Sequence, residues 1–279
     1  MTEADGEQVL ATGGVTEVVR VGDTVRRPTR PFTATIQSYL KHLHSKGFRD
    51  APIPLGYDEQ GREVLSYVDG DVPQEPLPDY ACTNEVLPPL ARLIRRLHDA
   101  AADFVPPAGA TWGGVPGTPA GVVPPFEEPE LISHQDYCPG NVVFRDGLPA
   151  ALIDFDLSRP TTRVADIVNA MYWWTPLMHP DDRPQALRDA DVPARARIFA
   201  DAYGMSAAQR ALVVPTAVRR AANSLPAMRA AADADPVFRR WWVGGLEQKL
   251  LRAQEWWVTE ADRVAAAICG PARTDRSAV

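Results

Sequence analysis

Lysine and cysteine are both scarce in this chain of 279 residues. The lysines are Lys41, Lys46 and Lys249 only, so a cation that contacts a ligand before position 41 has to be arginine. The cysteines are odd in number and widely spaced, at Cys82, Cys138 and Cys269. That spacing excludes a disulfide framework and a cysteine metal pair, and it favours a reducing, cytoplasmic location.

Long apolar runs and an excess of positive charge are also missing. No run approaches the roughly 18 apolar residues of a membrane span, so no membrane association is expected. The polar, acidic start of the chain over residues 1–8 is not a signal peptide. The formal net charge is −7, which disfavours a nucleic-acid partner.

The first third of the chain has the patterns of a small antiparallel sheet with one helix. Two apolar-rich runs at 18–21 and 24–27 flank Gly22-Asp23, which predicts a tight hairpin. Apolar residues at helical spacing predict a helix over 33–46, with Thr33 or Thr35 as its cap and Gly47 at its end. Two more strands are expected over 53–57 and 63–68.

The rest of the chain is mainly helical in pattern. A segment rich in proline and acid over 69–80 predicts a connection between two lobes, 1–68 and 69–279. Proline and glycine over 105–130 predict an irregular loop. The remaining expected elements are a helix over 84–102, short strands at 131–132, 142–144 and 151–153, and helices between 164 and 268 with breaks near 176–184, 204 and 236.

The segment over residues 133–166 carries the most informative polar pattern. His134, Asp136 and Asn141 stand in the arrangement H-x-D-x-x-x-x-N, and Asp154 follows two short apolar runs joined by a turn. Phosphoryl transfer needs a carboxylate that accepts the proton of the attacking hydroxyl, and oxygen ligands for magnesium. The pattern therefore predicts Asp136 as proton acceptor, with Asn141 and Asp154 as Mg²⁺ ligands.

Several stretches resemble one known family, over about residues 8 to 260. HQDYCPGN resembles the catalytic loop of the aminoglycoside phosphotransferase and choline kinase family, whose fold is similar to that of protein kinases. IDFD resembles its metal-binding segment, and GREVLSYVDGDVP its inter-lobe strand and hinge. The resemblance implies an α/β (α+β), bilobal kinase-like fold with a small antiparallel-sheet lobe and a larger helical lobe. It also implies a nucleotide in the cleft between them.

The same resemblance assigns roles to individual residues. Asp136 would be the catalytic base, and Asn141 and Asp154 would hold Mg²⁺. His134 would support the catalytic loop, and Asp166, twelve residues after Asp154, would brace it.

One feature of the family pattern is missing. Members pair a basic residue on the third strand with a glutamate on the next helix, but the helix over 33–46 has no acid, and Gln37 is its nearest polar substitute. The basic residue must be Arg26 or Arg27. The hairpin register places Arg26 on the face of Val19 and Val21, and we prefer Arg26 as the phosphate contact.

Two further nucleotide contacts are expected. The backbone amides of Gly13 and Gly14 could approach phosphates closely. Backbone groups of Ser66 and Val68 would pair with the base, without distinguishing ATP from GTP.

The acceptor is expected to be a hydroxylated antibiotic. Residues 171–270 carry 11 acids and 13 bases, so this region has too few carboxylates to favour a polycation. A glycoside or nucleoside antibiotic of low charge is therefore preferred to an aminoglycoside. The alternatives are a metabolic kinase for choline, sugars or amino alcohols, and a nucleotide-binding pseudokinase. The oligomeric state stays open.

Overall fold

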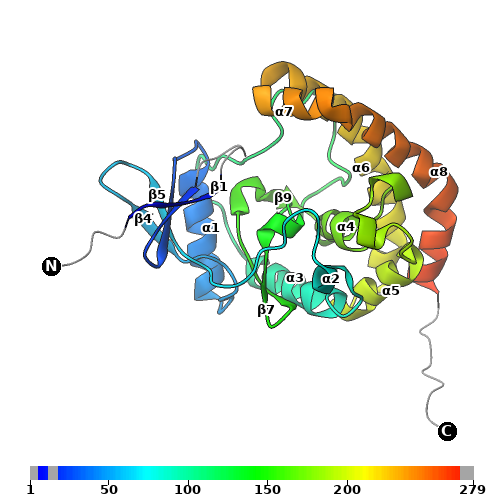
Figure 1. The fold of residues 1–279 in the computed structure, drawn as a ribbon, viewed down its shortest axis with the longest axis horizontal. Coiled ribbons are helices and arrows are strands. Elements are labelled where there is room, and N and C mark those ends of the chain that lie inside the picture. Colours follow the sequence, from blue (N-terminus) through cyan, green and yellow to red (C-terminus); the bar gives the residue numbers. More distant parts are fainter. Residues whose placement is uncertain (1–5, 12–17, 271–279) are drawn as a thin grey trace, which may run out of the picture.

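The computed structural model describes residues 6–11 and 18–270. A five-stranded antiparallel sheet with one helix forms the N-terminal part, and a larger, mainly helical part follows (Figure 1). The expected bilobal α+β fold is confirmed, while the exact division between residues 68 and 69 stays a prediction. Within the described ranges, no helix is both long and apolar enough to cross a membrane.

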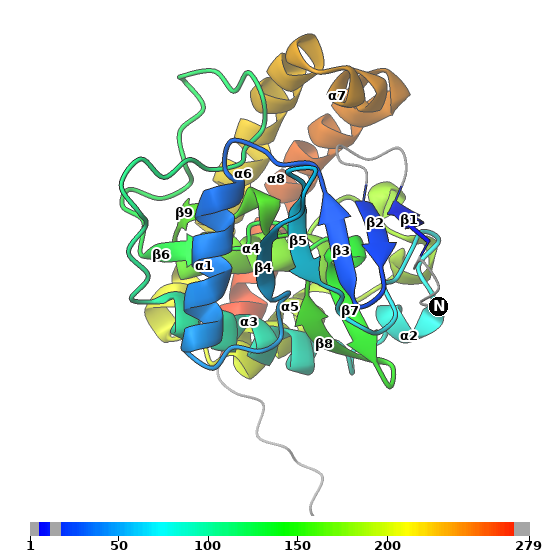
Figure 2. The same ribbon diagram turned by 90° about the vertical axis from the view of Figure 1, so that its left-hand side faces the viewer.

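The sheet has the strand order β1-β2-β3-β5-β4 (Figure 2). Its strands are β1 Gln8–Ala11, β2 Val18–Val21, β3 Thr24–Arg27, β4 Pro54–Tyr57 and β5 Glu63–Ser66. The β2–β3 hairpin turns at Gly22, whose φ of 56° suits glycine. Val19 pairs with Arg26, as the two-residue turn predicts.

Helix α1, Thr33–Ser45, lies beside the edge strand β4 and also contacts α3 of the helical part (Figure 2). Its apolar residues at helical spacing, Ile36, Tyr39, Leu40 and Leu43, are buried. Neither Thr33 nor Thr35 caps the helix. Its N-cap residue is Phe32, which gives no side-chain cap. The Thr35 hydroxyl instead accepts a hydrogen bond from the amide of Thr111, at 3.2 Å.

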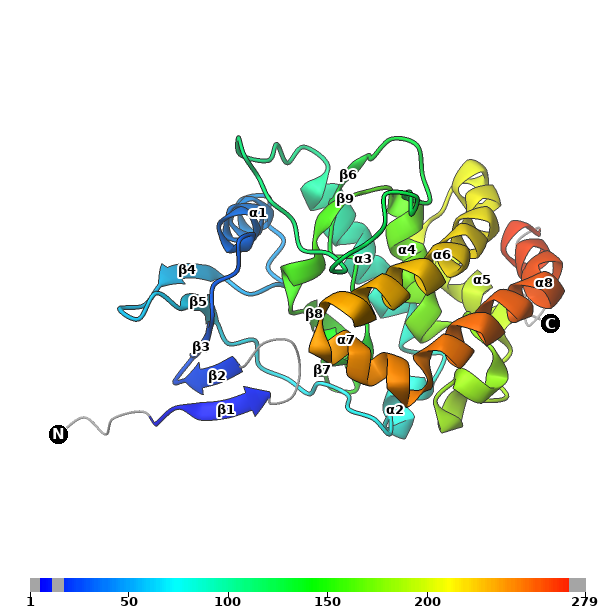
Figure 3. The same cartoon turned by 90° about the horizontal axis from the view of Figure 1, so that it is seen from above.

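The helical part is built around α3, Leu87–Ala101, whose apolar side is completely buried. Helices α6 and α8 pack together and form an arch with α7 and a π-helical turn over Trp242–Leu246 (Figure 3). The other helices are α2 Asp79–Cys82, α4 Arg163–Trp174, α5 Val192–Tyr203, α6 Ala207–Ala234, α7 Pro236–Trp241 and α8 Glu247–Cys269.

Two short strand pairs carry the loops that face the sheet. Strand β6, Leu131–Ser133, pairs with β9, Arg159–Thr161. Strand β7, Val142–Arg145, pairs with β8, Leu148–Leu152. The chain between β6 and β7, and the chain after β8, are thereby held beside each other.

Residues 105–130, which we call the strap, contain no helix or strand. At one end the Thr111 hydroxyl donates to the carbonyl of Pro31, just before α1. At the other end the Asn223 amide on α6 donates to the carbonyl of Val123 at 2.7 Å. The strap therefore connects the N-terminal part with the arch.

Gly113 is the point where the strap packs most closely on the chain after β8. A Cβ at this position would lie 1.9 Å from the carbonyl oxygen of Asp156, whereas nothing lies within 4 Å of one at Gly114. We expect Gly113→Ala to lower the free energy of unfolding by about 1–3 kcal/mol, because the strap or the Asp156 segment has to move. Gly114→Ala is the matched control, with an expected change below about 1 kcal/mol. Urea denaturation compares the two, and equal stabilities would contradict the packing.

Candidate active site

The structure brings Asp136, Asn141 and Asp154 together on two adjoining loops. Asn141 lies in the 3₁₀ turn before β7, and its side-chain amide donates to the Asp136 carboxylate at 2.8 Å. Asp154 follows β8, and the Ile153 amide donates to the Asn141 carbonyl at 3.0 Å. Asp154 adopts the left-handed backbone conformation with φ 60°, and its side chain is 51% exposed. The roles assigned to the three residues stay predictions.

The Asp136 carboxyl is in an environment that opposes its ionisation. Burial raises the pKa of Asp136, the nearby His134 ring lowers it, and the negative charge of Asp154 raises it again; the net shift is upward from the ordinary value. A cation between Asp136 and Asp154 would favour the charged forms of both.

The residues present suit Mg²⁺. The Asn141 amide nitrogen faces Asp136, which leaves its oxygen for another partner, and the Asp154 carboxylate is half-exposed. Mg²⁺ takes few protein oxygen ligands and keeps waters or substrate phosphates in its other positions. The part of the chain that the structure describes has no group of three or more His, Cys, Asp or Glu side chains that could hold a metal.

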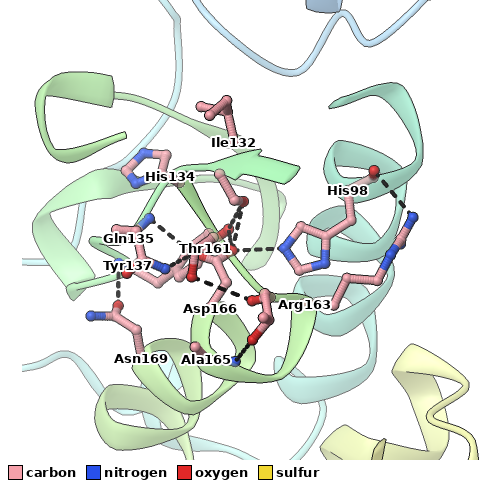
Figure 4. Close-up of polar contacts among 12 residues, drawn as sticks. His98, Ile132, His134, Gln135, Tyr137, Thr161, Arg163, Ala165, Asp166 and Asn169 are labelled. Atoms are coloured by element: carbon pink, nitrogen blue, oxygen red, sulfur yellow. Dashed lines mark hydrogen bonds and ion pairs between the residues drawn. The ribbon is translucent and has the colours of Figure 1, made fainter. Parts of the chain in front are cut away.

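Asp166 lies beneath the loop that carries Asp136 (Figure 4). Its fully buried carboxylate accepts hydrogen bonds from the Ser133 hydroxyl at 2.7 Å, from the Gln135 amide at 3.0 Å and from the Tyr137 hydroxyl. The His98 ring lies 2.7 Å away on the other side. Burial alone would raise the pKa of Asp166, but these contacts outweigh it and hold it at about 2.

His134 joins the two loops. Its ring lies 2.9 Å from the Ile153 carbonyl, directly before Asp154, and accepts from the Asp136 amide at 3.2 Å. It also packs against the ring of Phe155, with centroids 4.5 Å apart. The position agrees with the expected supporting role, which stays a prediction.

Arg27, and not the preferred Arg26, is the arginine of β3 that contacts the acids after β8. Arg26 contacts Thr24 and lies 3.7 Å from Asp58. Arg27 reaches Asp154, with 3.3 Å between Nη1 and Oδ1, and its Nη2 lies 2.6 Å from Asp156. The predicted register of the hairpin is correct, and it places Arg26 on the other face of the sheet from Arg27. Which arginine binds phosphate stays a prediction.

Glu63 is the residue that the sequence argument missed. It lies opposite Arg27 in the β3–β5 ladder and is completely buried, and Nε of Arg27 donates to it at 2.5 Å. The Gln37 amide of α1 donates to the same carboxylate at 3.3 Å. Burial lowers the pKa of Arg27, but the acids around it raise it more strongly. The missing helix glutamate is thus replaced by an acid on the neighbouring strand.

The other expected nucleotide contacts are less informative. Gly13 and Gly14 lie outside the described residues. The Ser66 amide already donates to the Ile53 carbonyl at 2.9 Å, so it is not free for a base. Val68 lies just after β5, on the segment that leads to the helical part. Its contact with a base stays a prediction.

The Arg27–Glu63 pair allows a test of stability with a neighbouring control. Arg27→Met leaves the buried Glu63 without its cation, which costs about 3–5 kcal/mol. Arg26→Met removes only a partly exposed, weak pair, which costs below about 1 kcal/mol. We expect the double variant Arg27→Met/Glu63→Gln to recover part of the loss. Chemical denaturation measures all three, and equal losses at positions 26 and 27 would contradict the assignment.

Comparisons with known sequences give the family, and comparisons with solved structures give the fold. Residues 118–211 match the model of the phosphotransferase enzyme family. The chain is 36% identical over 209 residues to the trifolitoxin immunity protein of Rhizobium leguminosarum bv. trifolii, covering 73% of this chain and 76% of that protein.

Solved structures with this fold include a choline/ethanolamine kinase family protein from Mesorhizobium loti. Its TM-score is 0.63 at 18% identity, covering 96% of this chain and 94% of that one. A microcompartment-associated aminopropanol kinase has a TM-score of 0.59 at 14% identity, with 95% and 93% covered. At these identities the likeness concerns the fold.

Proposed function

The chain belongs to the phosphotransferase enzyme family and is a small-molecule kinase, and on this premise we propose that it phosphorylates a hydroxyl group of an antimicrobial compound. The phosphate donor would be ATP or GTP with Mg²⁺. The observation that carries the proposal is the meeting of Asp136, Asn141 and Asp154 on adjoining loops, with Arg27 reaching Asp154 from the sheet.

The reaction follows from these positions. The acceptor hydroxyl attacks the γ-phosphorus and a new P–O bond forms. The bond from the γ-phosphorus to the leaving nucleoside diphosphate breaks, and the hydroxyl proton goes to the Asp136 carboxylate. The Asn141 amide holds that carboxylate in place. Mg²⁺, held by Asn141 and Asp154, would neutralise charge on the phosphates. Arg27, fixed by Glu63, would bind phosphate oxygens with its planar fork of donors.

The relative that covers most of the chain supports an antimicrobial acceptor. It is an immunity protein against trifolitoxin, and chemical modification of a toxin is one way to give immunity. Charge supports an acceptor other than a polycation, since residues 171–270 hold 13 bases against 11 acids. A low-charge glycoside or nucleoside antibiotic fits this balance better than an aminoglycoside does.

Replacement of Asp136 tests the chemical step. Asp136→Asn keeps the shape but cannot accept the proton, so kcat should fall by about 10²–10⁴-fold while Mg²⁺–nucleotide affinity changes little. Asp146→Asn, in the exposed β7–β8 turn, is the matched control with unchanged turnover. Release of the nucleoside diphosphate measures kcat, and calorimetry measures the affinity for the Mg²⁺–nucleotide.

The pH dependence of kcat/KM gives a second test of Asp136. Burial raises the pKa of Asp136. When the pH is lowered, its carboxylate is therefore protonated, and stops acting as a base, at a higher pH than an ordinary aspartate would be. Wild-type kcat/KM should therefore rise with pH through this pKa. A wild-type rate at Asp136→Asn would refute the site.

The acceptor class is tested with a panel of hydroxylated antibiotics and metabolites. Each is incubated with the protein, Mg²⁺ and ATP or GTP, and mass spectrometry detects the gain of one phosphoryl group. We expect low-charge compounds to be preferred, with a shallow salt dependence of KM, because exposed charges are screened beyond about 8 Å at physiological ionic strength. A polycationic aminosugar as best acceptor, with affinity that collapses in salt, would contradict this expectation.

A further inference from the structure

Two arginines approach Asp136 from the helical part of the molecule. Arg159 lies on β9, and its Nη2 donates to the Gln135 side-chain oxygen at 3.3 Å. Arg220 lies on α6, with its guanidinium carbon 4.7 Å from the centre of the Tyr172 ring. Both are partly buried. Among the described residues, no carboxylate lies within ion-pair distance of either guanidinium.

The two guanidiniums act on each other electrostatically, and neither forms an ion pair among the described residues. Burial lowers the pKa of both. Around Arg159, the negative charge of Asp166 raises the pKa and the positive charge of Arg220 lowers it, and Asp136 raises the pKa of both arginines; the net shift of each is downward. Arginine nevertheless stays protonated in proteins. Two positive charges held together away from solvent favour an anion between them, which would gain charge-assisted hydrogen bonds.

Both side chains are held in place before any ligand arrives. Gln135, the partner of Arg159, is itself fixed by hydrogen bonds from its backbone and side-chain amides to Asp166, at 3.0 and 2.6 Å. Tyr172, the partner of Arg220, packs edge-to-face on Trp173, with ring centres 5.1 Å apart. Little side-chain freedom remains to be lost on binding, which favours affinity.

These arginines belong to other elements than Arg27 does. Arg27 reaches Asp154 from the sheet, where the nucleotide phosphates are proposed. Arg159 lies on β9 and Arg220 on α6, and both elements belong to the helical part (Figures 1 and 3). Asp136 must meet the acceptor hydroxyl, so groups beside it on this side face the acceptor.

We propose that the acceptor carries one anionic oxyacid group, a carboxylate or a phosphate, which Arg159 and Arg220 bind beside the hydroxyl that faces Asp136. The inference rests on the proposed phosphoryl transfer at Asp136 and narrows the acceptor to a hydroxylated acid. A single anionic group is compatible with a low overall charge. A polycation would be repelled at this position.

A binding experiment tests the arginine pair without knowledge of the acceptor. Wild type, Arg220→Gln and Arg219→Gln are saturated with Mg²⁺–ADP, which fills the proposed nucleotide site. Acetate or inorganic phosphate is then titrated against chloride at equal ionic strength, and the melting temperature is followed. Arg219 is the matched control because it is the exposed neighbour on the same helix.

We expect at least one anion to stabilise wild type and Arg219→Gln, with at least tenfold weaker apparent affinity in Arg220→Gln. A stronger effect of acetate indicates a carboxylate on the acceptor, and a stronger effect of phosphate indicates a phosphate ester. Arg159→Gln should give the same loss, and it replaces Arg220→Gln if that variant does not fold. No stabilisation of wild type, or equal stabilisation of all variants, would overturn the inference.

The nucleotide titration separates this inference from the proposed function. If wild type binds no Mg²⁺–ADP, the proposed function fails, while the anion titration still reports on the arginines. If Arg220→Gln weakens Mg²⁺–ADP binding and leaves anion binding unchanged, the arginines belong to the nucleotide site and the inference is wrong. With an active panel, each hydroxy acid is compared with its amide. The acid should have the lower KM in wild type and lose that advantage in Arg220→Gln.

Discussion

The geometry of the site depends on the hydrogen bonds that the buried carboxylate of Asp166 accepts. A fully buried charge is costly unless several donors surround it, and here Ser133, Gln135 and Tyr137 all donate to it. The two residues between them contact the adjoining elements instead: the His134 ring meets the Ile153 carbonyl, and the Asp136 carboxylate accepts from the Asn141 amide. One internal carboxylate thus fixes the loop that carries Asp136.

The opposite wall of the site is fixed by strand pairing. Arg27 and Glu63 are neighbours across the β3–β5 ladder, so their contact follows from the sheet register. In the family pattern, the glutamate that pairs with the basic residue lies on the helix after the third strand. Its contact therefore depends on the position of that helix. Here α1 contributes only the neutral Gln37 amide. The orientation of Arg27 is therefore less sensitive to movement of α1, and the missing helix acid does not remove the charged contact.

Local signals in the sequence were sufficient for the elements and for the loop motif. The hairpin around Gly22, the helix that ends before Gly47 and the irregular strap were all correctly predicted, because turn residues and apolar spacing act over short distances. The contact of Arg27 with Glu63 was not predicted, because it depends on a partner strand 36 residues away. The short strand β9 and the helix α2 were missed for the same reason, since their pairing and packing partners are distant in the chain. An acid in an otherwise apolar strand was the available signal for Glu63.

The site has a cation on each side of its acids. Arg27 stands on the sheet side of Asp154, and Arg159 and Arg220 stand on the helical side of Asp136. Counting charges over the C-terminal region disfavours a polycation, yet it cannot distinguish a neutral pocket from one with a local excess of arginine. Asp136 requires a hydroxyl at one point, and the two arginines favour negative charge close by. The nearly balanced composition of residues 171–270 therefore combines surface ion pairs, such as Arg197 with Asp201, with Arg220, which forms no ion pair among the described residues.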